Sequence, residues 1–322
     1  MQLQQGDSKA ALAAYKEFLK ISQKLAAADP ASAQAQRDLS VSYDRIGNVH
    51  LQHGDTTAAL TAYQEILKIS QKIAAANPAS AQAQRDLSIS YERLGNVQLQ
   101  HGDTKAALDW YVKMYDIKKR LVSADPGSAV AHRDLLISML NIGKVAEQKT
   151  EFEKAIEWYQ KALDVPKNIP RPEYLANEKR VLEGRLRICR GAEMVLADLD
   201  AIEKVAYADR ADVLRAAIQA HVRRKAPDKA IAAANLLERA AKNGGDVYDA
   251  ACGYALCSAL VEKPEENERH AARAVALLKQ AIAKGYKDVA HLKKDADLDA
   301  LRGRADFQAL LKELEAKQPE KP

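Results

Sequence analysis

The sequence predicts an all-α protein, an open solenoid of antiparallel helix pairs, and three observations support this fold class. Alanine, leucine, lysine, glutamate and arginine dominate a chain of 322 residues, and these residues favour helices, whereas aromatic residues make up only 5%. Glycine and proline, with 14 and 10 residues, are scarce and mostly separate apolar patterns of helical period. A unit of about 48 residues also repeats, and such periods indicate stacked units rather than a closed globule.

The repeat becomes visible when the chain is aligned on itself. The segment Gly6–His53 aligns on Gly54–His101 without gaps, and again, more loosely, on Gly102–Lys149. The tripeptide Arg-Asp-Leu marks the same place in each unit, at residues 37–39, 85–87 and 133–135. A fourth, partial unit follows in register and ends at Pro166. We therefore expect a first domain, residues 1–166, that is one regular array.

Each unit is predicted to form two helices of about 20 residues, separated by turns with a clear chemical signature. Apolar side chains between two turns of the second unit recur every three or four residues, as in Ala59, Leu60, Tyr63, Ile66 and Leu67. Gly54 is suited to the positive φ that ends a helix, and Asp55 is suited to capping the next helix. Pro78 falls where one helix has ended and another begins.

The period fails after Pro166, and residues 167–322 form the second expected domain. Pro170 and Pro172 indicate a loop there. Helical patterns then continue, separated by breaks at Pro227, Gly244, Pro264 and Gly285. The expected helices are Glu173–Val195, Asp212–Arg223, Asp228–Ala241, Val247–Leu260, Asn267–Lys284 and Ala305–Lys317. We interpret them as further, degenerate helix pairs.

The units resemble the tetratricopeptide repeat. The stretch Leu94-Gly95-Asn96-Val97, followed by Ala107-Leu108 and Tyr111, fits that family's pattern, and the fourth unit, from Ile142 to Pro166, fits it best. The earlier units depart from the 34-residue norm, because each helix is longer by about two turns. The resemblance implies a right-handed superhelix in which small residues let paired helices approach closely, namely Gly47, Gly95 and Gly143 on one helix and Ala59, Ala107 and Ala155 on the other.

The last segment, residues 248–307, looks like the C-terminal tail of bacterial proteins in which tetratricopeptide units follow a Ser/Thr protein kinase domain. Its landmarks include Asp297-Leu298, Leu301-Arg302 and Phe307. The motifs of the kinase domain itself, such as Asp-Phe-Gly, do not occur in this sequence. The resemblance implies a link to bacterial kinase signalling.

The sequence also starts within a unit. Leu3–Asp7 matches Leu51–Asp55, which closes a first helix, so most of the corresponding first helix is not in the sequence. We therefore expect either a fragment of a longer protein or an unpaired helix whose apolar face allows self-association.

Charge and composition exclude several function classes. The net charge is +5 and the pI about 8.9, without clustered basic residues or many aromatics, so nucleic-acid binding by the basic second half is the weakest alternative. No membrane span or signal peptide is visible, and we expect a cytoplasmic protein without a membrane partner. The three cysteines lack zinc or redox spacing, so we expect buried free thiols at Cys189, Cys252 and Cys257. No cofactor or metal is expected.

No catalytic group of residues stands out, and we do not expect an enzyme. His53 and His101 share a repeat position with Lys149, an exchange that a catalytic role would not tolerate. Three aspartates each follow an arginine and are expected to form ion pairs between neighbouring units, namely Asp38, Asp86 and Asp134.

Protein binding is the remaining expectation. In the tetratricopeptide family the first helix of each pair lines a concave groove, and the resemblance implies eight ligand-facing residues: Asp44, Asn48, Gln52, Glu92, Asn96, Gln100, Lys144 and Gln148. Asn48 and Asn96 are expected to hydrogen-bond an extended peptide, since an amide both donates and accepts. Alternatively, all eight are solvated polar residues. We expect a non-catalytic scaffold that binds a peptide or helix in bacterial signalling, or else the regulatory C-terminal region of a larger Ser/Thr protein kinase.

Overall fold

The computed structural model describes residues 6–165 and 175–316, and within these residues every regular element is a helix. Contacts divide the chain into two compact units, Met1–Glu183 and Gly184–Pro322, which are described separately. The first unit contains α1 (Gly6–Ala28), α2 (Ala33–Gln52), α3 (Thr56–Ala76), α4 (Ala81–Gln100), α5 (Thr104–Ala124), α6 (Ala129–Gln148), α7 (Phe152–Asp164) and the start of α8 (Ala176–Ala197). The predicted all-α class is confirmed.

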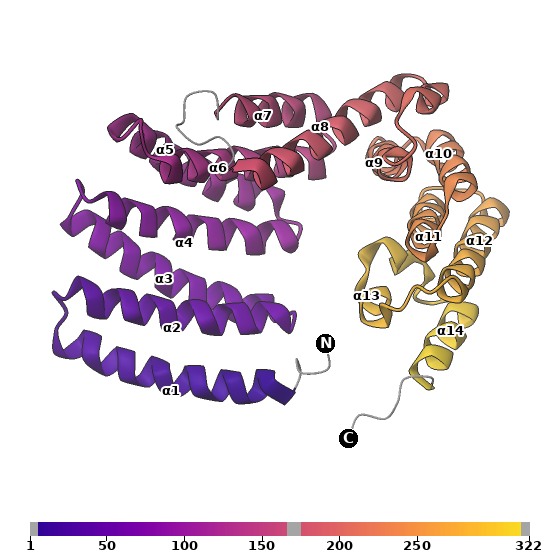
Figure 1. The fold of residues 1–322 in the computed structure, drawn as a ribbon. Coiled ribbons are helices and arrows are strands. Elements are labelled where there is room, and N and C mark those ends of the chain that lie inside the picture. The colour runs from indigo at the N-terminus through magenta and orange to yellow at the C-terminus, as the bar shows by residue number, and fades with distance from the viewer. Residues whose placement is uncertain (1–5, 166–174, 317–322) are drawn as a thin grey trace. The chain divides into compact units, whose positions relative to one another are not determined.

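Helices α1 to α7 stack one beside the next (Figure 1), and each packs on its neighbours in the sequence. We call α2, α4 and α6 the first helices of successive pairs, and α3, α5 and α7 the second helices. Helices α2 to α6 have 20 or 21 residues each, as predicted from the repeat. The open solenoid of antiparallel pairs is therefore confirmed, whereas its right-handed superhelix stays a prediction.

Local chemistry determines the tight turn between paired helices. Gly54 and Gly102 have φ of 76° and 86°, a conformation that glycine adopts without strain, and Thr150 occupies the third turn with φ of 58°. The side chain of Asp55 then accepts a hydrogen bond from the N–H of Ala58 and caps α3. The predicted glycine stop and aspartate cap are both confirmed.

Paired helices approach closely at one glycine–tyrosine contact in each unit. A Cβ atom added at Gly47 would lie 2.6 Å from Cε1 of Tyr63, so a larger residue would force a shift. The same contact recurs between Gly95 and Tyr111 and between Gly143 and Tyr159. The small residues expected opposite them are fully buried, namely Ala59, Ala107 and Ala155. The predicted close approach of the paired helices is confirmed.

Ion pairs join the first helices of neighbouring units. Nε of Arg37 on α2 lies 2.9 Å from Oδ2 of Asp86 on α4. Arg85 on α4 repeats this pair with Asp134 on α6, also at 2.9 Å. The prediction that these aspartates form ion pairs between units is confirmed for Asp86 and Asp134.

The second unit contains the rest of α8, followed by η3 (Leu199–Lys204), α9 (Arg210–Arg223), α10 (Pro227–Ala240), α11 (Gly244–Ser258), α12 (Pro264–Ala283), α13 (Val289–Lys294), η4 (Ala296–Leu301) and α14 (Ala305–Ala316). Helix α9 packs on α10, and α11 packs on α12, so the expected pairs are present. Pro227 and Pro264 are the first residues of α10 and α12, where the missing proline N–H costs no hydrogen bond. The sequence missed η3, α13 and η4, because six residues are too few to show a helical period.

The boundary between the two compact units does not coincide with the position at which the sequence repeat ends. The pattern changes at Pro166, whereas contacts divide the chain after Glu183, inside α8. Arg133 on α6 lies 2.7 Å from Glu178, which attaches the first turn of α8 to the array. The loop expected at Pro166, Pro170 and Pro172 lies outside the described residues. The predicted domains, 1–166 and 167–322, stay a prediction.

Two simpler expectations concern cysteines and membranes. Cys189, Cys252 and Cys257 are buried thiols that form no disulfide bond, as predicted. Among the described helices, none combines the length and apolar content that crossing a membrane requires.

Candidate functional site

The eight predicted binding residues lie on the first helices of three successive pairs. Helix α2 carries Asp44, Asn48 and Gln52, α4 carries Glu92, Asn96 and Gln100, and α6 carries Lys144 and Gln148. Within each helix they are four residues apart and so share one side. Gln52, Asn96 and Gln100 are exposed, and the other five are partly buried. We call these eight residues the first-helix face.

Both polar groups of Asn48 have partners inside the protein. Its Nδ2 donates to Oδ2 of Asp44 at 2.9 Å, and its Oδ1 accepts from the hydroxyl of Tyr63 at 2.9 Å. Asp44 in turn accepts from Nε of Arg93, at 2.8 Å. Burial raises the pKa of Tyr63 to about 12, with a further contribution from Asp44, so the hydroxyl keeps its proton at neutral pH. Asn48 therefore belongs to a network that holds the helix pair together.

Asn96 is the more available of the two predicted amides. Its Oδ1 accepts from the hydroxyl of Tyr111 at 2.7 Å, while its Nδ2 has no acceptor within the described part of the chain. In the third unit Lys144 takes this position, and Tyr159 donates to Oε2 of Glu147 at 2.6 Å instead. The tyrosine contact gives the repeated asparagine a structural role, whether or not it also binds a ligand.

Two exposed apolar side chains, Val41 and Ile89, extend the first-helix face, and they are not among the eight predicted residues. Val41, 47% exposed, precedes Asp44 by three residues, and Ile89, 37% exposed, precedes Glu92 by three. This spacing puts each on the same side of its helix as the polar row. The sequence could have indicated them, because Val41 and Ile89 are apolar residues at the same position of successive repeats. Apolar side chains beside a polar row suit a protein segment as ligand.

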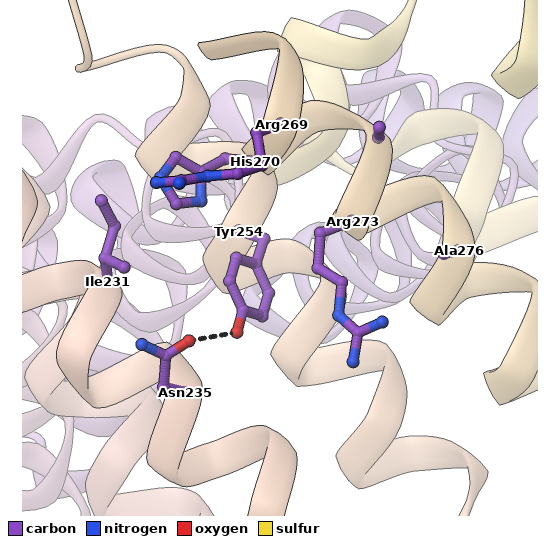
Figure 2. A pocket seen from close by; sticks show the side chains of 8 residues that line it. Ile231, Asn235, Tyr254, Arg269, His270, Arg273 and Ala276 are labelled. Atoms are coloured by element: carbon purple, nitrogen blue, oxygen red, sulfur yellow. Dashed lines mark hydrogen bonds between the residues drawn. The ribbon is translucent and has the colours of Figure 1, made fainter. Parts of the chain in front are cut away.

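The second unit contains a pocket of about 580 Å³ (Figure 2). Residues from α10, α11 and α12 line it, namely Ile231, Asn235, Tyr254, Arg269, His270, Ala272, Arg273 and Ala276. The hydroxyl of Tyr254 lies 2.5 Å from Oδ1 of Asn235, drawn dashed in Figure 2, and 2.9 Å from Oε2 of Glu238. Arg273 forms an ion pair with the same Glu238. The acceptors near this pocket are therefore already occupied.

The pocket offers mainly hydrogen-bond donors to a ligand. Burial lowers the pKa of His270, and the charge of Arg269 lowers it further, so the ring is neutral at physiological pH. The His270 ring stacks on Tyr254 with centroids 6.0 Å apart. Arg269 has no hydrogen-bond or ion-pair partner among residues 6–165 and 175–316. Such a donor set suits a small anionic group, and no sequence motif indicated it.

A cluster of titratable side chains connects α11 to the start of η4. Oδ2 of Asp295 accepts from the hydroxyl of Tyr248 at 2.6 Å and lies 3.6 Å from Sγ of Cys252. Ligand atoms of Cys252, Asp295 and Asp297 lie within 4.8 Å of one another, a spacing that could suit one metal ion. Burial raises the pKa of Cys252, and it raises that of Asp297 to about 6, with Asp295 adding to both. Asp295 also caps η4 through the N–H of Asp297, and we interpret the cluster as a structural contact.

Comparison with known proteins identifies one repeat. Residues 137–168, which include much of α6 and all of α7, match the family model of the tetratricopeptide repeat. The search of curated proteins finds no match to the chain. The crystal structure of BtubC (BKLC) from P. vanneervenii is 15% identical with a TM-score of 0.41, and the similarity covers 87% of this chain and 93% of that chain. The crystal structure of a tetratricopeptide repeat protein from Parabacteroides merdae is 13% identical with a TM-score of 0.37, covering 89% and 98%.

The family match agrees with the sequence, in which the fourth unit fits the tetratricopeptide pattern best. Repeats of this kind indicate a protein–protein interaction scaffold. The match does not extend to residues 248–307, and their resemblance to the tails of Ser/Thr protein kinases stays a prediction.

Proposed function

We propose that this protein is a non-catalytic interaction scaffold whose first-helix face binds a peptide or helix of a partner protein. The observation that carries the proposal is the recurrence, on neighbouring first helices, of exposed side chains at equivalent positions. Val41 and Ile89 form one such row, and Gln52 and Gln100 form another. Rows with the same spacing on stacked helices match the repetitive backbone of a bound segment.

Different side chains of the first-helix face would make different contacts with the ligand. Asn96 would donate from Nδ2 to a backbone carbonyl of the ligand, since this group has no acceptor among the described residues. Val41 and Ile89 would pack on apolar side chains of the ligand. Asn48 would contribute less, because Asp44 and Tyr63 already occupy its polar groups.

The cellular setting, the kinase alternative and self-association are supported by fewer observations than the binding face. The setting in bacterial signalling and the cytoplasm, and the alternative of a kinase regulatory region, derive from sequence resemblance and composition alone. Self-association through α1 is the alternative use of the apolar side chains that this helix exposes. A rise in mean mass with concentration in sedimentation experiments would support self-association.

A random peptide library displayed on phage and selected against the full chain tests the scaffold proposal. We expect enriched peptides to bind the Ile89→Asp, Gln100→Lys variant about tenfold or more weakly, because these side chains lie on the proposed surface. A matched control places the same changes of charge on the second helix α3, as Gln64→Asp with Gln71→Lys, and should keep the wild-type affinity. Equal binding to both variants, or no enrichment over an unrelated protein, would contradict the proposal.

A further inference from the structure

The end of the array at α1 exposes apolar side chains that the repeat buries elsewhere. Phe18, Ile21 and Leu25 are 42%, 56% and 55% exposed. In α3 the positions equivalent to Phe18 and Leu25 hold Ile66 and Ile73, which are each only 7% exposed. The same apolar stripe is therefore covered on α3 and uncovered on the otherwise similar helix α1.

Among the described helices, α1 has one packing neighbour fewer than α3 and α5. Helix α3 packs between α2 and α4, and α5 packs between α4 and α6, whereas α1 packs mainly on α2. In α5, Met114 and Ile117 at the positions of Phe18 and Ile21 are accordingly 0% and 4% exposed. A first helix on the free side of α1 would complete the arrangement found at α3 and α5.

An acidic residue of α2 also lacks the partner that its counterpart on α4 has. Asp86 on α4 accepts from Gln82 through Oδ1 at 2.7 Å and from Arg37 through Oδ2 at 2.9 Å. Asp38 on α2 accepts from Gln34 through Oδ1 at 2.8 Å in the same way. Its Oδ2 has no hydrogen-bond or ion-pair partner in the described part of the chain. An arginine equivalent to Arg37, which pairs with Asp86, is therefore not present beside Asp38 among the described residues.

The basic side of the contact is incomplete in the same way. Arg93 on α4 reaches back to Asp44 on the preceding first helix at 2.8 Å. Its counterpart Arg45 on α2 is exposed and has no ion-pair partner among the described residues. Asp38 and Arg45 are seven residues apart and so lie two turns apart on one side of α2. The side chains of α2 that meet α4, Arg37 and Asp44, have the same spacing.

We propose that this end of the array is a docking site for an amphipathic helix that carries an arginine and, seven residues later, an acidic residue. Its arginine would reach Oδ2 of Asp38, its acidic residue would reach Arg45, and its apolar side would cover Phe18, Ile21 and Leu25. We call these five residues the end face. A second folded copy fits it less well, because the Arg37 and Asp44 of each copy are already paired with α4.

A labelled peptide with the sequence of α2, residues 33–52, is a suitable probe, because it carries arginine and aspartate in this register. Fluorescence anisotropy with the full chain should show saturable binding. The Asp38→Arg, Arg45→Asp protein should bind this peptide about tenfold or more weakly, because both charge pairs become repulsive. A peptide with its own charges exchanged, Arg37→Asp with Asp44→Arg, should show the opposite preference for the two proteins. Ile21→Asp should weaken the binding of both peptides.

The controls separate the end face from general charge effects. An Asp299→Arg protein, changed in the second unit, should bind the α2 peptide as the wild type does. Circular dichroism checks that each variant folds, and the exchanged peptide tests the same contact on the unaltered protein. Absence of saturable binding, or no preference between the two peptides, would overturn the proposal. A wild-type dimer that Ile21→Asp converts into a monomer would also overturn it, because a second copy would then occupy the face.

Discussion

Nζ of Lys118 on α5 lies 3.0 Å from Oδ2 of Asp134 on α6, and the lysine side chain is only 2% exposed. The same oxygen accepts from Nε of Arg85 at 2.9 Å. In the preceding unit the position of Lys118 is Ser70, which shares a 2.8 Å hydrogen bond with Ser90. The third unit therefore has a buried ion pair where the second has a contact between two hydroxyls.

We expect Asp134→Asn to lower the free energy of unfolding by about 3–5 kcal/mol, because Lys118 would remain buried without an anion. Urea denaturation followed by circular dichroism measures this change. Adding Lys118→Met should recover most of the loss, since the uncompensated charge is then gone while an apolar side chain of similar length remains.

The matched control is Asp86→Asn, at the same repeat position one unit earlier. Its partner Arg37 has a side chain that is 33% exposed and can turn to water, so we expect a loss of about 0–1 kcal/mol. Equal losses at Asp86 and Asp134 would contradict a special role for Lys118.

Gly95→Ala should destabilise the array, although alanine is the better helix former. A Cβ at this position would lie 2.6 Å from Cε1 of Tyr111, which is itself buried. Overpacking of this kind costs about 1–3 kcal/mol, more than the helix propensity gained. A lower urea midpoint with an unchanged slope would confirm the effect.

Gly184→Ala, within α8, should have the opposite effect on stability, because the added Cβ has room there. A Cβ there meets only the end of the Arg187 side chain, at 4.0 Å. The substitution should stabilise the protein by up to about 1 kcal/mol, the difference in helix propensity. If both alanine variants shifted the midpoint in the same direction, the steric explanation for Gly95 would fail.

Asp297→Asn should stabilise the second unit at pH 7.5 but not at pH 4.5. Burial raises the pKa of Asp297 to about 6 in the folded state, above its ordinary value, so the folded protein holds a proton that the unfolded chain releases between about pH 4 and 6. Stability from this group is therefore present below pH 4 and lost as the pH rises through 6. Since one pKa unit corresponds to about 1.4 kcal/mol, we expect a gain on the order of 2 kcal/mol at pH 7.5.

The neighbouring Asp299→Asn variant serves as the control for this pH dependence. Its side chain is 70% exposed and pairs with Arg302 on the surface. We expect differences from the wild type of less than about 1 kcal/mol at both pH values. Thermal unfolding at a series of pH values measures the stability gain of Asp297→Asn. A gain that does not change with pH would mean that the raised pKa is not its cause.

The Asn48–Tyr63 hydrogen bond should couple the two residues in a double-mutant cycle. Asn48→Ala leaves the buried hydroxyl of Tyr63 without its acceptor and should cost about 1–3 kcal/mol. In a Tyr63→Phe background the same change should cost about 1 kcal/mol less, as measured by urea denaturation. Additive effects would mean that Asn48 does not stabilise the helix pair through Tyr63.

Much of the fold could be predicted, because its signals are local. Gly54 ends a helix and Asp55 caps the next through contacts within a few residues, so their roles follow from residue type and position. Helix α13 and the 3₁₀ helix η4 could not be predicted in this way. Each has only six residues, which is too few to show a helical period, and Asp295 between them also accepts a hydrogen bond from the distant Tyr248.

The candidate site was predicted less completely. The positions of the eight residues on three first helices followed from the repeat and the family resemblance. The hydrogen bond from the Tyr63 hydroxyl to Oδ1 of Asn48 could not be predicted, because it depends on how α2 and α3 cross. The pocket at Arg269 and Tyr254 was also missed, since its walls come from three helices whose relative positions no single segment encodes.

By itself, the sequence determined the helix pairs, their turns and the repeated arginine–aspartate positions, because period and cap chemistry are properties of short segments. Only the tertiary structure decided which copy of a repeated residue has a partner. Asp86 meets Arg37, whereas Oδ2 of Asp38 meets no arginine in the described residues, although both aspartates stand in nearly identical sequence. The physical reason is that the partner comes from the neighbouring unit, so identical segments differ by what packs beside them.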